Sequence, residues 1–409
     1  MLMHFLFEIE GFNALDHLTP VASELLRRGN SVTFVAVGTS PLGNNPRIEF
    51  LRRYSDFEIT SLEQVSTPRQ RRLFKWLSRF FFGRPKRIFV SDALRLRLLR
   101  FCSNVLGVFH FPGFRLPNVA VSGWGDPSSL LMIHARRNGA KLASLPHGYP
   151  CQKNSDFNPH VSAIRKVTGK NPDFSLRNHF DVYVVATERN RRLLLSWSMA
   201  PDVVEVWGNA RFCPEWIRSL HQIVPPFELT QDGDARQRVL VFLPSATSGF
   251  KLDLVHSLIE RLASEDIIAV LKPHTREGQD LGALLPIRLL RHNNLTVHLD
   301  TESSSLMRWA DTVINFATGT AIEALMQGKR IIFTRYLTEN RLSWEDCAGV
   351  TIADSEDDVV NSLRDRSWGN DPVATEPYLR QEIFADGNVS EPLTHYAERL
   401  ELLGSARER

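Results

Sequence analysis

The stretch HFLFEIEGFNALDHLTPVASELLRRGNSVTFVAV, residues 4–37, indicates how the chain begins to fold. Its first six residues, HFLFEI, predict a short buried strand, and SVTFVAV at 31–37 predicts a second one. Between them we expect a loop over 11–17 and then a helix that stops at Gly29. The apolar residues of that helix recur at helical spacing: Leu18, Val21, Ala22, Leu25 and Leu26. Strand, helix and strand in this order predict a βαβ unit.

The same alternation continues along the first half of the chain. Apolar strands interleaved with helices indicate a parallel sheet that is covered on both faces. The further strands are predicted at 118–123, 141–145, 181–186 and 203–208, and helices at about 125–138 and 188–199.

The alternation breaks at IVPPFELTQDGDARQR, residues 223–238, which has the composition of an exposed connector. Beyond it strands are predicted at 239–243, 267–272, 295–299, 312–316, 330–333 and 349–353, helices at 252–264, 303–310 and 319–327, and a last helical stretch at about 375–404. We therefore predict an α/β protein with two facing Rossmann-like domains, residues 1–222 and 238–374, separated by a cleft. Residues 375–409 are expected to pack back across the junction as a helix.

Composition and cysteine usage narrow the class of protein. The 409 residues are 43% apolar, enough for two domains of roughly 150 to 200 residues. No apolar run reaches 18 residues, and Glu8 and Glu10 interrupt the opening where a signal peptide would be apolar, so we expect a cytoplasmic protein. The four cysteines form no CxxC pair, which argues against structural zinc and a disulfide framework.

INFATGTAIEALMQGK, residues 314–329, places a polar turn after a predicted strand. Open α/β sheets bind ligands at the carboxyl ends of their strands. We expect Thr318 or Thr320 to cap the following helix, Gly319 to let a phosphate approach the backbone, and Glu323 to accept hydrogen bonds from a ribose diol. The alternative is an ordinary capped helix in which Glu323 offsets the helix dipole.

LKPHTRE, residues 271–277, follows a second strand and directs Lys272, His274 and Arg276 toward the same sheet edge. This combination suits a diphosphate or phosphodiester, and the alternative is a basic surface turn. SATSGFK, beginning at Ser245, is a weaker version of the same arrangement after another strand.

These motifs resemble the nucleotide-binding half of GT-B glycosyltransferases. With LPHGYP and VWGNARFCPEW they are similar to bacterial surface-polysaccharide enzymes, including CDP-glycerol glycerophosphotransferases and capsule Kdo transferases. The resemblance covers most of residues 140–355. It implies that His274 and the turn Thr318–Thr320 hold donor phosphates, that Glu323 holds the ribose, and that the domain over 238–374 binds the nucleotide sugar while the domain over 1–222 binds the acceptor.

Three residues of the first half are candidates for the base that deprotonates an acceptor hydroxyl. His147 follows a strand and precedes Gly148, and an HG dipeptide is catalytic in the glycerophosphotransferase-like relatives that the chain resembles. His17, beside Asp16, looks like the His-x-x-Pro start of family 1 glycosyltransferases, although it can equally bond a neighbouring carbonyl. Glu8 can support either histidine or act as a carboxylate base.

Two further segments bear on donor binding. GNARF, residues 208–212, places Asn209 and Arg211 where they can approach the donor, or else simply starts the crossing to the second domain. Asp300 and Glu302 form a D-x-E pair, but protein cations and helix ends usually neutralise the phosphates in this fold. We therefore expect a metal-independent reaction, with no cofactor beyond the nucleotide-activated substrate.

Residues 69–100 carry eleven Lys or Arg and one Asp, although the whole chain has a net charge of only +3. Interleaved Phe and Trp suit an anionic membrane surface, and the alternative is a basic amphipathic helix packed on the first domain. No recognition motif supports nucleic-acid binding.

The predicted function is transfer of a group from a CMP-, CDP- or UDP-linked donor to a surface polysaccharide or lipid-linked acceptor, in the cytoplasm or at the inner face of the plasma membrane. Two alternatives stay open. One is a nucleotide-sugar 2-epimerase-like isomerase, and the other is a non-catalytic glycan- or nucleotide-binding component of a polysaccharide assembly complex.

Overall fold

A computed structural model describes residues 2–406 except for 38–44, 69–71, 73–114, 124–128, 147, 149–150, 152, 154–158, 230–235, 245–249, 275–284, 286–291, 317 and 366–370. The chain forms two compact units. Unit 1 consists of Met1–Gly148, Pro172–Arg211 and Glu382–Arg409, and unit 2 of Tyr149–Asn171 and Phe212–Gln381.

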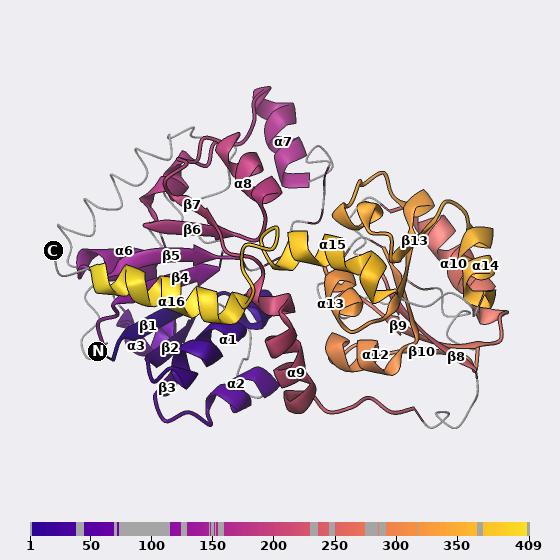
Figure 1. Ribbon diagram of the computed structural model, residues 1–409, viewed down its shortest axis with the longest axis horizontal. Helices are drawn as coiled ribbons and strands as arrows, with labels where there is room; N and C mark the ends of the chain where they lie inside the picture. Colours follow the sequence, from indigo (N-terminus) through magenta and orange to yellow (C-terminus); the bar gives the residue numbers. More distant parts are fainter. Residues whose placement is uncertain are drawn as a thin grey trace. The chain divides into compact units, whose positions relative to one another are not determined.

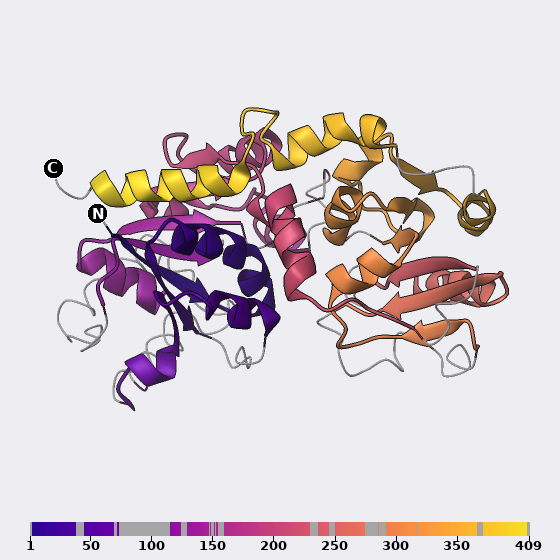
Figure 2. The same cartoon turned by 60° about the horizontal axis from the view of Figure 1, so that its bottom comes forward.

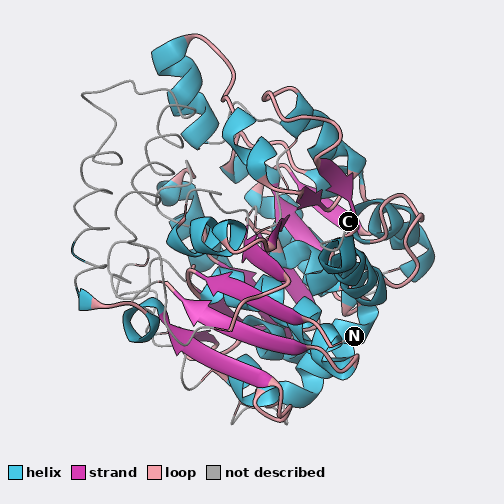
Figure 3. Cartoon of the chain, turned by 90° about the vertical axis from the view of Figure 1, so that its left-hand side faces the viewer, coloured by secondary structure: helices cyan, strands magenta, loops and turns pink. Residues whose placement is uncertain are grey.

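Unit 1 contains a seven-stranded sheet in which each pair of neighbouring strands is parallel (Figures 1 and 3). Its order is β3-β2-β1-β4-β5-β6-β7. The strands are β1 (His4–Ile9), β2 (Ser31–Ala36), β3 (Phe57–Ser61), β4 (Val119–Gly123), β5 (Lys141–Leu145), β6 (Val182–Val185) and β7 (Val204–Val206). The predicted parallel sheet is confirmed, and β3 is an additional strand that the sequence patterns did not indicate.

Helices cover the sheet of unit 1. In the first half of the chain the helices are α1 (Phe12–Arg27), α2 (Pro46–Leu51), α3 (Leu62–Val65), α6 (Leu130–Arg137) and α8 (Glu188–Leu195), with the 3₁₀ turns η2 (Ser175–His179) and η3 (Ala210–Phe212). The turn η3 spans the boundary between the residues of unit 1 and those of unit 2. α1 packs on β1, β2 and β4, whereas α6 packs on β4 and β5. The five apolar residues predicted for the core face of α1 are all buried, because they lie on the stripe that faces the sheet.

The predicted loop over 11–17 is wrong. α1 begins at Phe12, directly after Gly11, and the first turn is closed by the amide of Leu15, which donates to the carbonyl of Gly11 at 3.0 Å. The apolar periodicity starts late because the first turn of the helix is half exposed. His17 therefore lies in the second turn of α1 and not at its start.

Unit 2 contains a six-stranded sheet that is also parallel throughout, with the order β10-β9-β8-β11-β12-β13. The strands are β8 (Gln237–Phe242), β9 (Ile267–Lys272), β10 (Leu295–Val297), β11 (Thr312–Asn315), β12 (Arg330–Thr334) and β13 (Val350–Ala353). The helices are α7 (Pro159–Thr168), α9 (Pro214–Ile223), α10 (Leu252–Ala263), α12 (Ser303–Trp309), α13 (Thr320–Met326) and α14 (Glu356–Arg364), with the 3₁₀ turns η5 (Arg335–Leu337) and η6 (Ser343–Asp346).

The two faces of this second sheet are covered by different helices (Figure 1). α10 and α14 pack against each other and against β9, β12 and β13, and their apolar side chains join the strands in one buried cluster. α12 and α13 contact each other, β8, β11 and β12, and α9. The carboxyl ends of the strands are thus left to loops, which is where a ligand site is expected.

The stretch predicted as one helix over 375–404 is two helices, α15 (Pro372–Ile383) and α16 (Pro392–Ser405). Ala385, Asp386 and Gly387 have φ angles of 48°, 60° and 82°, in the left-handed region where a right-handed helix cannot continue. Pro392 then starts α16 at a position where its missing amide is not needed.

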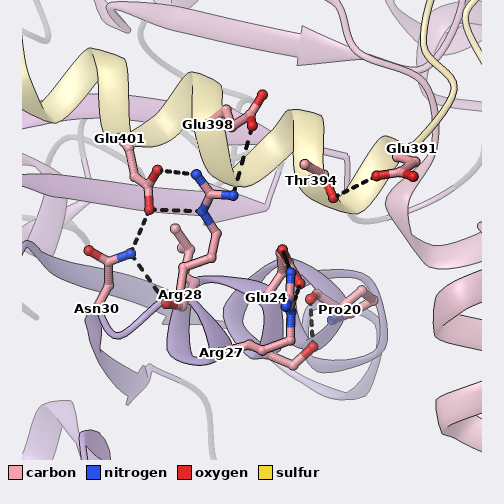
Figure 4. Close-up of polar contacts among 11 residues, drawn as sticks. Pro20, Glu24, Arg27, Arg28, Asn30, Glu391, Thr394, Glu398 and Glu401 are labelled. Carbon is pink, nitrogen blue, oxygen red and sulfur yellow. Dashed lines mark hydrogen bonds and ion pairs between the residues drawn. The ribbon is translucent and has the colours of Figure 1, made fainter.

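α16 belongs to unit 1 and lies alongside α1 (Figure 2). The guanidinium of Arg28, just after α1, donates to both carboxylate oxygens of Glu401, at 3.1 and 2.8 Å, and Asn30 donates to the same carboxylate at 2.8 Å (Figure 4). The more exposed Glu398 is 3.8 Å from Arg28. These contacts fix the end of the chain on the first helix.

Three cysteines in the described ranges, Cys151, Cys213 and Cys347, are buried thiols that form no disulfide there. Among those same ranges, no helix is both long and apolar enough to cross a membrane. Cys102 and nearly all of the basic segment 69–100 lie outside the described residues.

Candidate functional site

The carboxyl edge of the six-stranded sheet brings the two predicted donor-binding motifs of unit 2 together. Phe242, the last residue of β8, is level with Lys272 of β9 on one side and with Asn315 of β11 on the other. Neighbouring strands are about 4.8 Å apart, so the two motifs begin roughly 10 Å from each other. The chain leaves β8 toward β9 and returns on its other side at β11, which makes this the point where the strand order reverses.

Asn315 organises the turn that follows β11. Its side-chain amide donates to the hydroxyls of Thr318 and Thr320, at 3.2 and 3.3 Å, and its carbonyl oxygen accepts from the amide of Thr318 at 3.1 Å. The two threonine hydroxyls also bond each other. Asn315 itself is fully buried. The turn is therefore held from beneath by a strand residue.

The predicted capping of α13 by a threonine is wrong. Gly319 is the N-cap residue, and no side chain caps the helix. The amides of Ala321 and Ile322 donate to the carbonyls of Thr318 and Gly319, both at 3.2 Å. The threonine hydroxyls are directed to Asn315 instead, because a strand-end amide with two donors lies within reach of both.

Lys272 and His274 differ in how deeply their side chains are buried. Lys272 is 5% exposed, and its ammonium donates to the carbonyl of Leu299, just after β10. Burial lowers the pKa of Lys272, and the carboxylates of Glu302 and Asp300 oppose that effect. His274 is only half-buried. The D-x-E pair thus neighbours a lysine, and within the described part of the chain no group of three side chains suited to a metal ion occurs.

Glu323 lies in the first turn of α13 and is 2% exposed. Its carboxylate accepts a hydrogen bond from the amide of Gln327 at 3.3 Å, and the same amide donates to the hydroxyl of Ser304 at 3.3 Å. Gln327 is four residues further along, on the same face of the chain as it leaves the helix. Gln327 belongs to none of the predicted site residues, although its spacing of four residues from Glu323 could have indicated it.

Three predicted site residues lie outside the described residues: His147, Arg276 and Ser245. Their roles stay predictions that rest on the sequence motifs.

In unit 1, Glu8 is the penultimate residue of β1, next to β4, where that sheet reverses its strand order. It is 3% exposed and accepts a hydrogen bond at 3.0 Å from the hydroxyl of Ser129, the N-cap of α6. The structure thus places this candidate base at the ligand-binding edge expected for an open sheet.

His17 is half-buried beside a buried ionic cluster. The carboxylate of Asp16 accepts from Arg47 at 3.0 Å and from Arg211 at 2.5 Å, and Asp16 and Arg47 are 5% and 2% exposed. Burial raises the pKa of Asp16, but Arg211 and Arg47 outweigh it and the pKa lies below its ordinary value. At least one donor of the Arg211 guanidinium is therefore engaged by Asp16 within unit 1.

The GNARF segment contacts the last residue of α15 and a residue of α16. Asn209 is 2% exposed, and its backbone amide donates to the carbonyl of Ile383 at 2.8 Å. The hydroxyl of Tyr396 donates to the carbonyl of Gly208 at 2.9 Å. These contacts give the segment a packing role; donor binding by Asn209 and Arg211 stays a prediction.

Comparison with known proteins identifies the fold. No protein-family model and no curated protein matches the sequence. A putative UDP-N-acetylglucosamine 2-epimerase from Listeria monocytogenes superposes with a TM-score of 0.57 at 12% identity, over 98% of this chain and 95% of that one. For the calicheamicin glycosyltransferase CalG4 the values are 0.53 and 15%, over 100% of both chains.

The UDP-GlcNAc 2-epimerase from Neisseria meningitidis, solved with UDP-GlcNAc bound, gives a TM-score of 0.54 at 14% identity, over 99% of this chain and 100% of that one. Identities this low carry the fold alone. The predicted pair of Rossmann-like α/β units of GT-B type is confirmed.

Proposed function

We propose that this chain is a transferase that binds a nucleotide-activated donor at the carboxyl edge of the unit 2 sheet. The observation that carries the proposal is the register that sets Lys272 and Asn315 level on either side of β8. A basic turn and a hydroxyl-rich turn flanking the point of strand reversal suit an anionic ligand.

Within this site, each group has a chemical role. The imidazole of His274 and the turn Thr318–Thr320 would contact the donor phosphates, and Glu323 would accept hydrogen bonds from the ribose hydroxyls. As the bond to the transferred group breaks, negative charge builds on the departing phosphate, and donors fixed around it lower the energy of that state. Protein cations can stabilise this charge without a metal ion, and we therefore propose a metal-independent transfer.

Unit 1 would supply the acceptor hydroxyl and the base that removes its proton. His147 is our first candidate for this base, with His17 and Glu8 as alternatives. The proposed acceptor is a surface polysaccharide or a lipid-linked glycan, in the cytoplasm or at the inner face of the plasma membrane. The basic segment 69–100 would then contact anionic lipid.

Isothermal titration calorimetry with the free nucleotide tests the donor site. The nucleotide is first chosen by a thermal-shift screen of CMP-, CDP-, UDP- and GDP-linked compounds, since a bound ligand raises the melting temperature by mass action. We expect His274→Ala and Glu323→Ala each to weaken binding about tenfold, which corresponds to about 1.4 kcal/mol.

His292→Ala is the matched control for His274→Ala. This exposed histidine precedes β10, at the opposite edge of the same sheet, and its loss should leave the affinity unchanged. His147→Ala should abolish turnover while nucleotide binding is kept. Unchanged affinity in both His274→Ala and Glu323→Ala would reject the proposed site.

A second candidate is a nucleotide-sugar 2-epimerase, because the Listeria and Neisseria proteins share this fold. An epimerase releases an altered nucleotide sugar without any acceptor, whereas a transferase leaves the donor intact until an acceptor is added. One NMR spectrum of the donor after incubation with the protein distinguishes the two. A non-catalytic binding protein would bind the nucleotide and leave the donor unchanged both without and with an acceptor.

A further inference from the structure

The turn that follows β11 in unit 2 is held by the side chain of Asn315. The side-chain oxygen of Asn315 accepts from the backbone amide of Thr318 at 3.1 Å. Its nitrogen donates to the carbonyl of Thr318 at 3.3 Å, and to the hydroxyls of Thr318 and Thr320 at 3.2 and 3.3 Å. Asn315 is fully buried, whereas both threonines are half-buried. A ligand at this edge of the sheet therefore meets the threonines, and Asn315 acts from beneath them.

The backbone amide of Thr318 fixes the direction in which the Asn315 side chain faces. An N–H group needs an acceptor, so the atom that it meets on Asn315 must be the oxygen. The nitrogen then faces the two hydroxyls. With the side chain turned over, two donors would meet at the Thr318 amide, and that hydrogen bond would be lost.

This orientation determines where the hydroxyl protons of the two threonines point. An amide nitrogen can only donate, so neither hydroxyl directs its proton toward it. The two hydroxyls bond each other, which uses the proton of one of them. In the part of the chain that the structure describes, no further group accepts a hydrogen bond from either hydroxyl. One O–H donor of the pair therefore remains for a ligand.

The same contacts strengthen this remaining donor. The nitrogen of Asn315 donates to the hydroxyl oxygens, and one hydroxyl donates to the other, so the bonds run in one direction toward the outward O–H. Bonds aligned in this way polarise one another. The ligand atom that meets the pair must be an acceptor, and a charged phosphate oxygen forms shorter and stronger hydrogen bonds than a neutral acceptor does.

The neighbouring turn also favours an anionic acceptor. Asn315 is level with Phe242 of β8, and Phe242 is level in turn with Lys272, the residue from which the basic turn with His274 begins. An outward hydroxyl donor and a basic turn thus flank the end of β8 at the same edge of the sheet.

We propose that Asn315 is a positioning residue of the donor site, which directs one hydroxyl proton of the Thr318 and Thr320 pair onto a phosphate oxygen of the nucleotide. This inference rests on the proposed function, because it concerns the turn that is proposed to contact the donor phosphates. It adds that the turn recognises phosphate through an O–H group whose direction is set by a strand residue. A ligand group that itself donates a hydrogen bond would meet a second donor at this position.

The joint replacement Thr318→Val and Thr320→Val tests the contact with phosphate. Valine has the shape of threonine without the hydroxyl, so this double variant is expected to fold. We expect the affinity for the nucleoside diphosphate to fall about tenfold by calorimetry, because a hydrogen bond to a charged group is lost. The affinity for the matching nucleoside, measured by displacement, should not change. A turn that had merely lost its shape would weaken both ligands, since Glu323, the proposed ribose contact, follows in the same helix.

Asn315→Asp tests the direction of the protons. Aspartate has the same shape and still accepts from the Thr318 amide, but a carboxylate cannot donate, so both hydroxyl protons turn inward to it. Calorimetry at about pH 8, far above the ordinary pKa of aspartate, keeps the carboxyl ionised. We expect the affinity for the diphosphate to fall about thirtyfold.

A double-mutant cycle separates this effect from the added charge. In the valine background no hydroxyl proton is left to turn, so Asn315→Asp should cost only about threefold there, through charge alone. Equal losses in the two backgrounds would overturn the proposal. Asn294→Asp is the matched control. Its amide donates to the carbonyl of Glu265 at 3.3 Å just before β10, at the opposite edge of the sheet, so the same change of charge should leave the affinity unchanged.

Should Asn315→Asp fail to fold, Asn315→Leu keeps the shape and removes the polar atoms. The hydroxyls then have no fixed direction, and we expect the affinity for the diphosphate to fall about fivefold with the nucleoside unaffected. Wild-type binding that persists unchanged in the valine or leucine variant would overturn this inference and leave the donor site standing. A wild-type protein that binds no nucleotide would overturn the proposed function and this inference together.

Discussion

Replacing Gly208 by alanine should destabilise unit 1 more than replacing a glycine at which an added Cβ meets no close neighbour. Gly208 has a φ of 77°, and a Cβ placed on it would lie 2.2 Å from the carbonyl oxygen of Ile383. No neighbour can give way easily, because that oxygen is backbone and already accepts the amide of Asn209 at 2.8 Å. The carbonyl of Gly208 is also fixed, by the hydroxyl of Tyr396.

The magnitude follows from these contacts. An alanine with a left-handed φ costs about 1–2 kcal/mol. Separating Gly208 from Ile383 breaks a buried backbone hydrogen bond and weakens the bond from Tyr396, for about 2–3 kcal/mol more. We therefore expect Gly208→Ala to lower the free energy of unfolding by about 3–5 kcal/mol.

Gly29→Ala is the matched control in the same unit. Its φ of 85° imposes a similar conformational cost, but the nearest atom to its Cβ is a leucine methyl at an ordinary 3.8 Å. We expect a loss of about 1 kcal/mol. The free energy of unfolding of unit 1 is measured for both variants by urea denaturation that is monitored through hydrogen exchange of peptides from β1 and β4.

Equal losses in the two glycine variants would refute the reasoning. Should Gly208→Ala fail to fold, Tyr396→Phe tests the same contact with an expected loss of about 1 kcal/mol. Nucleotide affinity should be unchanged in Tyr396→Phe, because the contact serves packing.

Three other predictions concern the contacts of Glu401 with Arg28 and Asn30, the buried His4 and the proposed donor site. Glu401→Gln should lower the stability of unit 1 by about 1 kcal/mol, whereas Glu398→Gln, whose carboxylate is 54% exposed, should cost less than about 0.5 kcal/mol; denaturation curves measure both. Burial, and then Arg115, lower the pKa of His4 from 6.5 to about 4. The unfolded chain thus binds more protons than the folded one in this range, so stability should fall as the pH drops from 6.5 to 4, by at most about 3 kcal/mol, and His4→Gln should remove that part of the pH slope. Gln327→Met should weaken nucleotide binding about fivefold by calorimetry if Gln327 orients Glu323, and unchanged affinity would remove Gln327 from the site.

The sheet architecture could be predicted because parallel strands that are buried on both faces are continuous apolar runs. KLASL and IIAVLK match β5 and β9 residue for residue. The strand over 57–61 was missed because only Phe57 is buried there, so its sequence, FEITS, shows no apolar run. The break between α15 and α16 depends on three left-handed residues, of which two are not glycine, and composition does not reveal such a turn.

The candidate site was predictable in position and less so in contacts. Each motif follows a strand, and parallel strands end at one edge, so the sequence alone brings Lys272 and Asn315 to the same edge of the sheet. The partners of each side chain depend on tertiary packing. Asn315 bonds the threonine hydroxyls for which the sequence suggested capping, and Arg211, a predicted donor residue, also donates to the carboxylate of Asp16, a contact that the sequence did not indicate.

Hydrogen exchange with and without nucleotide tests the central claim most directly. With the nucleotide that stabilises the protein most, at saturating concentration, we predict slower exchange in the peptides that contain Lys272–His274 and Thr318–Glu323. Peptides from the opposite edge of the same sheet, such as Asp311–Val313, should exchange as before. Protection confined to unit 1, or no protection with any of the four nucleotide classes, would contradict a donor site at the carboxyl edge of the six-stranded sheet.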